Sequence, residues 1–67
     1  MITDLFDFEE LKLRPSFAIK RYKESLYRGE LEEGMRHGQG ICVYEIGRVY
    51  EGAWLDDKRH GKGYERF

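Results

Sequence analysis

Apolar and polar residues alternate in two stretches of the chain, and each stretch predicts a β-hairpin. Tyr27 and Leu31 fall on one face of the first strand in one stretch. Tyr50 and Trp54 fall on one face of the first strand in the other. Successive side chains of a strand point to opposite faces, so each strand would have one largely apolar face. A polar loop follows in both stretches, and a second strand then begins with Gly-x-Gly.

The two stretches, residues 27–49 and 50–67, are copies of one repeat. They align at a fixed offset of 23 residues. Leu31 in the first copy takes the place of Trp54 in the second. A fixed period of this length is typical of repeat proteins, in which each unit stacks on its neighbours. Identical residues occupy six pairs of positions: Tyr27 and Tyr50, Gly29 and Gly52, Arg36 and Arg59, His37 and His60, Gly38 and Gly61, Gly40 and Gly63.

The glycines of the chain are confined to the repeats, since all eight lie between Gly29 and Gly63. Glycine weakens an isolated strand and usually marks the close approach of another group. We expect a tyrosine or tryptophan ring of a neighbouring strand to lie flat over the Gly-x-Gly segments. Eight recurring residues would then have structural roles: Gly29, His37, Gly38, Gly40, Gly52, His60, Gly61 and Gly63.

The residues before the repeats divide into an acidic and a basic part. We expect residues 1–14 to form an acidic helix or an extended arm. The dipeptide Arg14-Pro15 would end a helix, because the residue before proline avoids the helical conformation. Residues 15–26 form a basic connector, in which residues 17–22 alternate in part and predict the second strand of a degenerate earlier unit.

The recurring motif resembles the MORN repeat (membrane occupation and recognition nexus). It reads Tyr-x-Gly-x-Leu/Trp and then, after four intervening residues, Arg-His-Gly-x-Gly. Residues 27–49 match a full copy, and residues 50–67 match a copy that is incomplete at its C-terminal end. The first copy departs from the family by having Leu31 where the family favours tryptophan. Residues 1–13 match nothing in the family pattern.

The resemblance implies a mainly β fold, in which antiparallel hairpins stack into a curved ladder with an aromatic groove. Here a short N-terminal helix or arm would precede the ladder. Proteins of this family are mostly non-catalytic adaptors of junctional membranes, lipid-kinase regulatory regions and cytoskeletal or ciliary assemblies. Many of them bind a helix or a peptide in the groove or dimerise end to end. The resemblance thus implies a non-enzymatic scaffold of the cytoplasm, the cytoskeleton or the cilium.

A single-layer sheet has no second layer to cover its apolar face, so part of this face is expected to bind a protein. The alternative is a plain hydrophobic core. Two repeats are fewer than the roughly three that a repeat array needs for stability. The chain would therefore be a small subunit of an assembly, a self-associating module or a fragment of a longer array. The expected contact residues are Tyr27, Leu31, Tyr44, Tyr50 and Trp54, with Phe6 and Phe8 from the N-terminal part.

Basic residues in the hairpin loops support an alternative function, peripheral binding of phospholipid headgroups. Acidic residues share the same loops, so a mixed, solvated sheet edge explains these charges as well. The residues in question are Arg36, Lys58, Arg59 and Lys62.

Metal binding and catalysis find little support in the sequence. His37 and His60 recur at equivalent places, which favours a shared structural role over metal coordination. Cys42 lies in an apolar strand and is the only cysteine, so we expect a small buried side chain and no internal disulfide. We expect no metal, no cofactor and no enzymatic activity.

Composition narrows the class of partner. The chain has 67 residues and a net charge of −1, so overall charge does not favour nucleic acid. No apolar run approaches the ~20 residues of a membrane span, and the N-terminal residues lack the pattern of a signal peptide. We expect an intracellular protein that binds other proteins.

Overall fold

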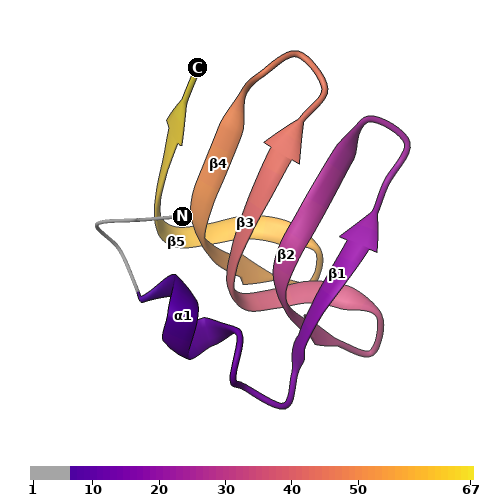
Figure 1. Ribbon diagram of the computed structural model, residues 1–67, viewed down its shortest axis with the longest axis vertical. Coiled ribbons are helices and arrows are strands. Elements are labelled where there is room, and N and C mark those ends of the chain that lie inside the picture. The colour runs from indigo at the N-terminus through magenta and orange to yellow at the C-terminus, as the bar shows by residue number, and fades with distance from the viewer. Residues whose placement is uncertain (1–6) are drawn as a thin grey trace.

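A short helix and five strands make up the part of the chain that the structure describes, residues 7–67. In this computed structural model the strands form one antiparallel sheet, and their order across the sheet is their order along the chain (Figure 1). The predicted ladder of stacked hairpins is confirmed, and before it, where a helix or an arm was expected, the structure has a short helix. The elements are α1 (Phe8–Leu11), β1 (Phe17–Arg21), β2 (Ser25–Glu32), β3 (Met35–Tyr44), β4 (Val49–Leu55) and β5 (Lys58–Arg66).

The hairpins β2–β3 and β4–β5 close with the same kind of two-residue turn. The φ angles are 52° and 78° at Glu33 and Gly34, and 49° and 70° at Asp56 and Asp57. Two residues of positive φ match the right-handed twist of the flanking strands and therefore favour a tight hairpin. Glycine adopts this conformation freely, and aspartate adopts it more readily than most residues. Different sequences can therefore close equivalent turns.

The first strand completes an earlier, partial unit. β1 pairs antiparallel with β2, from Phe17 opposite Glu30 to Arg21 opposite Leu26. The pairing of β1 with β2 is equivalent to the pairing of β3 with β4. β1 therefore has the position expected for the second strand of the degenerate earlier unit.

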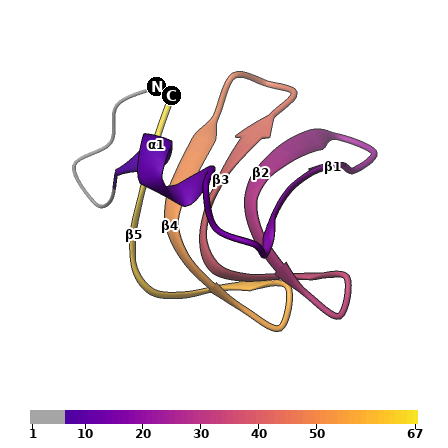
Figure 2. The ribbon, with the colours of Figure 1, turned by 60° about the horizontal axis from the view of Figure 1, so that its bottom comes forward.

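Each hairpin bends at its glycines. The strand register shifts between Gly29 and Leu31, and it shifts at the equivalent place between Gly52 and Trp54. A shift of this kind is a β-bulge, which bends the strand that carries it. Figure 2 shows the resulting curvature of the strands. The strands also approach closely here, because a Cβ on Gly29 would overlap the Cα of Gly40.

One face of the sheet, called the aromatic face below, carries a cluster centred on Trp54. The indole packs edge-to-face against Tyr27 at 5.4 Å and against Tyr50 at 5.2 Å between ring centroids. Each such pair contributes about 0.5–1.5 kcal/mol beyond the burial of its area. The buried members of the cluster are Tyr27, Cys42, Tyr50 and Trp54, and Tyr22, Leu31 and Tyr44 pack against them.

The opposite face carries a smaller apolar cluster beneath α1. Ile41 precedes Cys42 in β3 and so points away from the aromatic face. It is buried together with Phe8 and Leu11 of the helix. The carboxylate of Asp7 caps α1 by accepting hydrogen bonds from two backbone N–H groups. Isolated helices this short are unstable in water, so packing on the sheet holds α1 in place.

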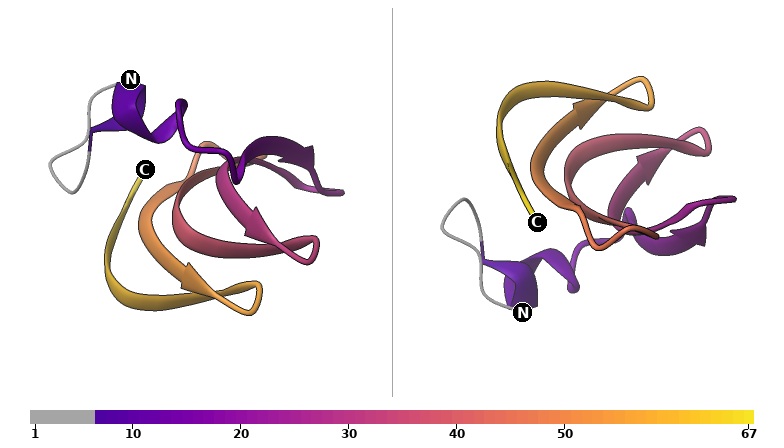
Figure 3. Two further views of the ribbon diagram at one scale, coloured as in Figure 1. Left: turned by 90° about the horizontal axis from the view of Figure 1, so that it is seen from below. Right: turned by 90° about the horizontal axis from the view of Figure 1, so that it is seen from above.

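The two hairpin turns project toward the same side of the sheet (Figure 3). They lie close enough for the backbone N–H of Asp57 to donate to the carbonyl of Arg36, 2.9 Å away. Within residues 7–67, no helix has the length and apolar character needed to cross a membrane.

Candidate functional site

An open groove of about 840 Å³ lies beside the aromatic face, where the loops after β1 and β3 meet the turn of β4–β5. Five basic side chains line it and only two acidic ones, so its field favours anionic groups. The lining residues are Tyr22, Lys23, Glu24, Ser25, Arg36, Tyr44, Arg48, Trp54, Asp57, Lys58 and Arg59.

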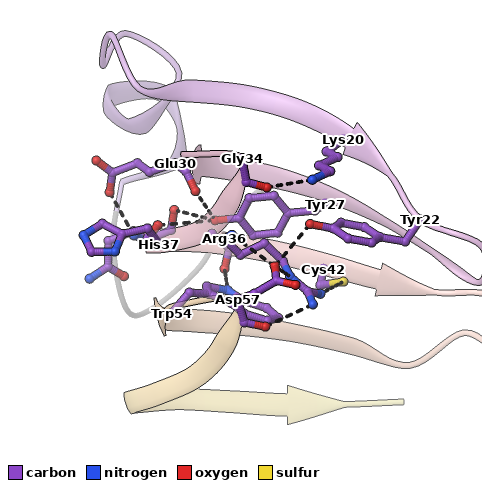
Figure 4. A network of polar contacts seen from close by, with 12 residues as sticks. Lys20, Tyr22, Tyr27, Glu30, Gly34, Arg36, His37, Cys42, Trp54 and Asp57 are labelled. Atoms are coloured by element: carbon purple, nitrogen blue, oxygen red, sulfur yellow. Dashed lines mark hydrogen bonds and ion pairs between the residues drawn. The ribbon is translucent and has the colours of Figure 1, made fainter. Parts of the chain in front are cut away.

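Arg36 is one of the residues that line this groove, and its guanidinium lies between two aromatic rings (Figure 4). Its guanidinium carbon is 4.4 Å from the ring centroid of Tyr22 and 4.5 Å from that of Trp54. The ring faces are electron-rich and attract the cation. The Arg36 side chain is only 15% exposed. The Arg36 side chain therefore links Tyr22, in the loop after β1, to Trp54 of β4.

Asp57, in the turn of the second hairpin, completes this contact. Its Oδ1 accepts from Arg36 Nε at 2.7 Å and from the Arg36 backbone N–H at 3.1 Å. The hydroxyl of Tyr22 donates to the same oxygen at 3.3 Å. The hydrogen bond from Arg36 lowers the pKa of Asp57 below its ordinary value. Burial alone would lower the pKa of Arg36, but Asp57 outweighs burial and raises it.

Arg59 occupies the equivalent position in the second hairpin. Its guanidinium carbon lies 5.4 Å from the ring centroid of Tyr44 and 4.3 Å from that of Tyr50. Its Nη2 donates to the hydroxyl of Tyr44 and to Glu65 Oε2, both at 3.0 Å. Burial would lower the pKa of Arg59, and these two hydrogen bonds reverse the effect and raise it. The Arg59 side chain is 38% exposed, because no following hairpin covers it among the described residues.

The structure corrects the role expected for three aromatic residues. Tyr27, Trp54 and Tyr50 are 0%, 3% and 6% exposed, so their rings form the core, and of the three only Trp54 also lines the groove. A Cβ on Gly40 or on Gly63 would overlap the ring of Tyr27 or of Tyr50, respectively. The rings thus fill the space that the glycines leave, which makes the contact surface smaller than expected.

Hydrogen bonds hold these buried rings in place. The hydroxyl of Tyr27 donates to the carbonyl of Glu30 at 2.8 Å, and the indole Nε1 of Trp54 donates to the carbonyl of Gly40 at 3.2 Å. Burial raises the pKa of the Tyr27 hydroxyl well above its ordinary value. Both side chains are therefore satisfied within the chain.

The other residues expected at a partner contact lie in different parts of the structure. Tyr44 lines the groove and is half-buried, and Leu31 packs at the margin of the aromatic cluster. Phe8 is buried under the opposite face, so it does not belong to this surface. Phe6 lies outside the described residues.

Sequence reasoning missed Tyr22, although a signal for it was present. Tyr22 precedes Tyr27 much as Tyr44 precedes Tyr50. This spacing identifies Tyr22 as the counterpart of Tyr44. Lys23 and Arg48 were also missed, because only the fold brings their loops to the groove.

The four basic residues considered for phospholipid contact lie in different environments. Arg36 is enclosed and paired, so its guanidinium is not free for a headgroup. Lys58 and Arg59 line the groove, whereas Lys62 is exposed on β5 outside it. Contact with phospholipid stays a prediction.

The recurring histidines and the glycines that follow them lie in β3 and β5, whereas Gly29 and Gly52 lie in β2 and β4. Gly38 and Gly61 have φ angles of 63° and 60°, a conformation that favours glycine. His37 Nε2 is 3.3 Å from Glu32 Oε2, and His60 is exposed. The conformation shared by the two glycines gives a backbone reason for their recurrence.

Cys42 is a buried free thiol whose sulfur lies 3.9 Å from Arg36 Nη1. Among residues 7–67, no three histidine, cysteine, aspartate or glutamate side chains are grouped so that they could hold a metal ion.

Comparison with known proteins agrees with this architecture. Human and mouse alsin are each 46% identical to the chain over 44 residues, which are 66% of this chain and 3% of alsin. A Plasmodium berghei protein named inactive protein tyrosine kinase pTKL is 34% identical over 44 residues, 64% of this chain and 3% of that protein. No solved structure matches the chain.

The chain thus spans only a small part of the length of these relatives. The family profile described as MORN repeat matches residues 27–47 and 50–67, which cover most of the two hairpins β2–β3 and β4–β5. A match over more than half of the chain establishes the family. The chain belongs to the MORN-repeat family.

Proposed function

We propose that this chain is a non-enzymatic protein-interaction module, and that the groove around Tyr44 and Lys58 is its contact surface. The observation that carries the proposal is the combination of half-buried rings and unpaired cations in one open groove. Among the described residues, Lys23 and Lys58 take part in no ion pair. An acidic and partly apolar protein segment complements such a lining.

The groove itself is rigid, which favours binding. The Arg36–Asp57 pair ties its floor across two hairpins, and the core of aromatic rings supports it from below. A preorganised surface loses little conformational entropy on association. The module would work within a larger assembly, for which the cytoskeleton and the cilium are the expected settings.

The second candidate function is binding of anionic phospholipid. It is supported by Lys58, Arg59 and Lys62, which are exposed cations on one strand. Lipid headgroups would engage all three by charge, whereas a protein in the groove would not reach Lys62.

A matched pair of charge reversals separates the two functions. Lys58→Glu changes the groove, and Lys62→Glu changes the same strand outside it. We expect Lys58→Glu and Tyr44→Ala to weaken binding to a purified protein partner at least tenfold, and Lys62→Glu to leave the affinity unchanged. The partner is first identified by co-purification with the native chain, and its Kd is then measured by calorimetry.

Vesicles of phosphatidylcholine with phosphatidylserine provide the second arm of the test. Sedimentation of the chain with these vesicles, lost equally in Lys58→Glu and Lys62→Glu, would establish the lipid function instead. Equal affinities of the wild type, Lys58→Glu and Tyr44→Ala for the protein partner would overturn the groove proposal.

A further inference from the structure

Glu30, at the bulge of β2, holds the segment between α1 and β1 against the first hairpin. Its Oε2 accepts a hydrogen bond from Arg14 Nη1 at 3.0 Å, and its Oε1 accepts one from the hydroxyl of Ser16 at 3.0 Å. The backbone N–H of Gln39 in β3 donates to Oε2 at 2.8 Å. One half-buried carboxylate therefore links the N-terminal segment to two strands of the sheet.

This contact does not belong to the repeat motif. The residue equivalent to Glu30 in the second hairpin, at the same offset of 23 residues, is Ala53. The strand register shifts at both places, so alanine is compatible with the bulge and the bulge does not require a carboxylate. Attachment of the N-terminal segment is therefore the role that distinguishes Glu30 from Ala53.

The attached segment includes α1, which has few other contacts that stabilise it. A helix of four residues is not stable alone in water. Its apolar side chains, Phe8 and Leu11, cover Ile41 on the face opposite the aromatic face. The hydrogen bonds to Glu30 lie directly after this helix along the chain, so they contribute to keeping α1 on the sheet.

Ser16 is accessible and has basic neighbours in the sequence. It is exposed and lies in the turn before β1. Lys12 and Arg14 precede it by four and two positions. Protein kinases select their substrates by charge patterns of this kind. The other serine of the chain, Ser25, is half-buried in β2 and follows Glu24, so it lacks both properties.

We propose that Ser16 is a phosphorylation site and that its modification releases α1 from the sheet. The hydroxyl oxygen of Ser16 attacks the γ-phosphorus of ATP on a protein kinase, and the bond from that phosphorus to the β–γ bridging oxygen breaks. ADP leaves, and the hydroxyl proton passes to the catalytic base of the kinase. Because α1 covers the face opposite the aromatic face, this switch is additional to the proposed function of the groove.

The phosphate would change both links between Glu30 and the N-terminal segment. Ser16 loses the O–H that it donates to Oε1, and the carboxylate then faces a group with a charge of about −1.5 to −2 at pH 7. Like charges this close repel each other. Arg14 pairs with the phosphate instead of with Glu30, because a guanidinium can donate two parallel hydrogen bonds to phosphate. Of the three donors to Glu30, only the N–H of Gln39 remains.

A chain of 67 residues can be synthesised with phosphoserine at position 16. We expect amide hydrogen exchange of residues 8–14, followed by NMR, to be at least tenfold faster than in the unmodified chain, because the helix opens more often. The fluorescence of Trp54, the only tryptophan, should stay unchanged, since its ring packs on the other face. Unchanged fluorescence would show that the sheet remains folded.

Variants of Glu30 test the cause of the release. Glu30→Ala should by itself accelerate exchange of residues 8–14, and phosphoserine at position 16 should then add little, because the carboxylate that it repels is absent. Glu30→Gln keeps a hydrogen-bond acceptor and removes the charge, so the phosphate should accelerate exchange less than in the wild type. If Glu30→Ala changes the fluorescence of Trp54, Glu30→Gln alone is used.

Labelling by a kinase tests access to the turn. The probe is cyclic-AMP-dependent protein kinase with magnesium and ATP, because this enzyme selects basic residues before serine. Mass spectrometry of proteolytic peptides should place one phosphate on Ser16 and none on Ser25. Ser16→Ala should remain unlabelled.

Two outcomes would overturn the proposal. One is equal or slower exchange of residues 8–14 in the phosphorylated chain, which would show that the phosphate and Arg14 hold α1 in place. The other is a chain that the kinase leaves unlabelled at Ser16. Neither result bears on the groove test with Tyr44→Ala, which concerns the other face of the sheet.

Discussion

The hairpins β2–β3 and β4–β5 share one sequence motif, but they differ in how deeply their side chains are buried and in how their arginines are paired. In the first, Tyr27 is fully buried and Arg36 is held between two rings and a carboxylate. In the second, every residue of β5 except Arg66 is exposed, and Arg59 relies on Glu65 of its own strand. The difference shows that side chains of one repeat are buried and paired by the repeat that follows, since Trp54 and Asp57 of the second hairpin contact Arg36 of the first.

The arrangement explains how a small sheet without a second layer builds a core. The ring of Trp54 leaves its own hairpin and packs against Tyr27 of the preceding one. Its indole N–H donates to Gly40 of that hairpin. Stability is then shared at the interface between repeats, as expected for a quasi-one-dimensional array.

The largest expected effect is on Trp54. We expect Trp54→Ala to lower the free energy of unfolding by about 3–5 kcal/mol, because it removes a buried ring that joins two hairpins. Leu31→Ala, at the equivalent place in the first hairpin, should cost less because Leu31 is only partly buried. Urea denaturation followed by circular dichroism measures both. If Trp54→Ala unfolds the chain, Trp54→Phe replaces it. Equal losses at the two positions would contradict the comparison.

The glycines beneath the rings come next. Gly40→Ala should destabilise the chain by about 3 kcal/mol, since the new Cβ overlaps the enclosed ring of Tyr27. Gly63→Ala should cost less, because Tyr50 lies beside the exposed strand β5 and can shift. Thermal unfolding of the two variants makes the comparison, and a larger loss for Gly63→Ala would show that the second hairpin is the more tightly packed.

The two arginines form a third matched pair. Arg36→Ala should cost about 2 kcal/mol, because it leaves Asp57 without its cation and removes two ring contacts. Arg59→Ala should cost about 1 kcal/mol or less, as expected for an exposed ion pair. The measurement is the midpoint of urea denaturation at constant ionic strength. Similar midpoints for both variants would mean that the contacts of Trp54 and Asp57 with Arg36 add nothing to the free energy of unfolding.

Acidification tests the Arg36–Asp57 contact most directly. The pKa of Asp57 is lower in the folded chain than in the unfolded chain, so its ion pair stabilises the fold above the unfolded pKa. This contribution is lost as pH falls below about 4, toward the folded pKa. Asp57→Asn should therefore remove about 1 kcal/mol or less, since solvent screens the partly exposed carboxylate, and should flatten that part of the pH profile.

Asp56 provides the control for this smallest effect. It lies beside Asp57 in the same turn and is exposed. Asp56→Asn should leave the pH dependence of the melting temperature between pH 2 and pH 6 close to that of the wild type. If the two variants give the same profile, the stabilisation comes from the turn as a whole rather than from the contact with Arg36.

Much of the architecture followed from local sequence pattern. The offset between Tyr27 and Tyr50 defined the repeat, and alternation predicted the strands. Gly34 marked one turn directly, because glycine favours positive φ. These features depend on neighbouring residues in the chain, so the sequence by itself determined the hairpins, their order and the family.

Only the tertiary structure decided which rings are core and which line the groove. Tyr27 and Tyr44 are both tyrosines of the repeats, yet Tyr27 is fully buried and Tyr44 lines the groove. Their burial depends on the strand that lies beside them, and the contact between Arg36 and Asp57 joins residues 21 positions apart. Such pairs form where bulges bend two hairpins together, and the chemical character of a residue does not contain that geometry.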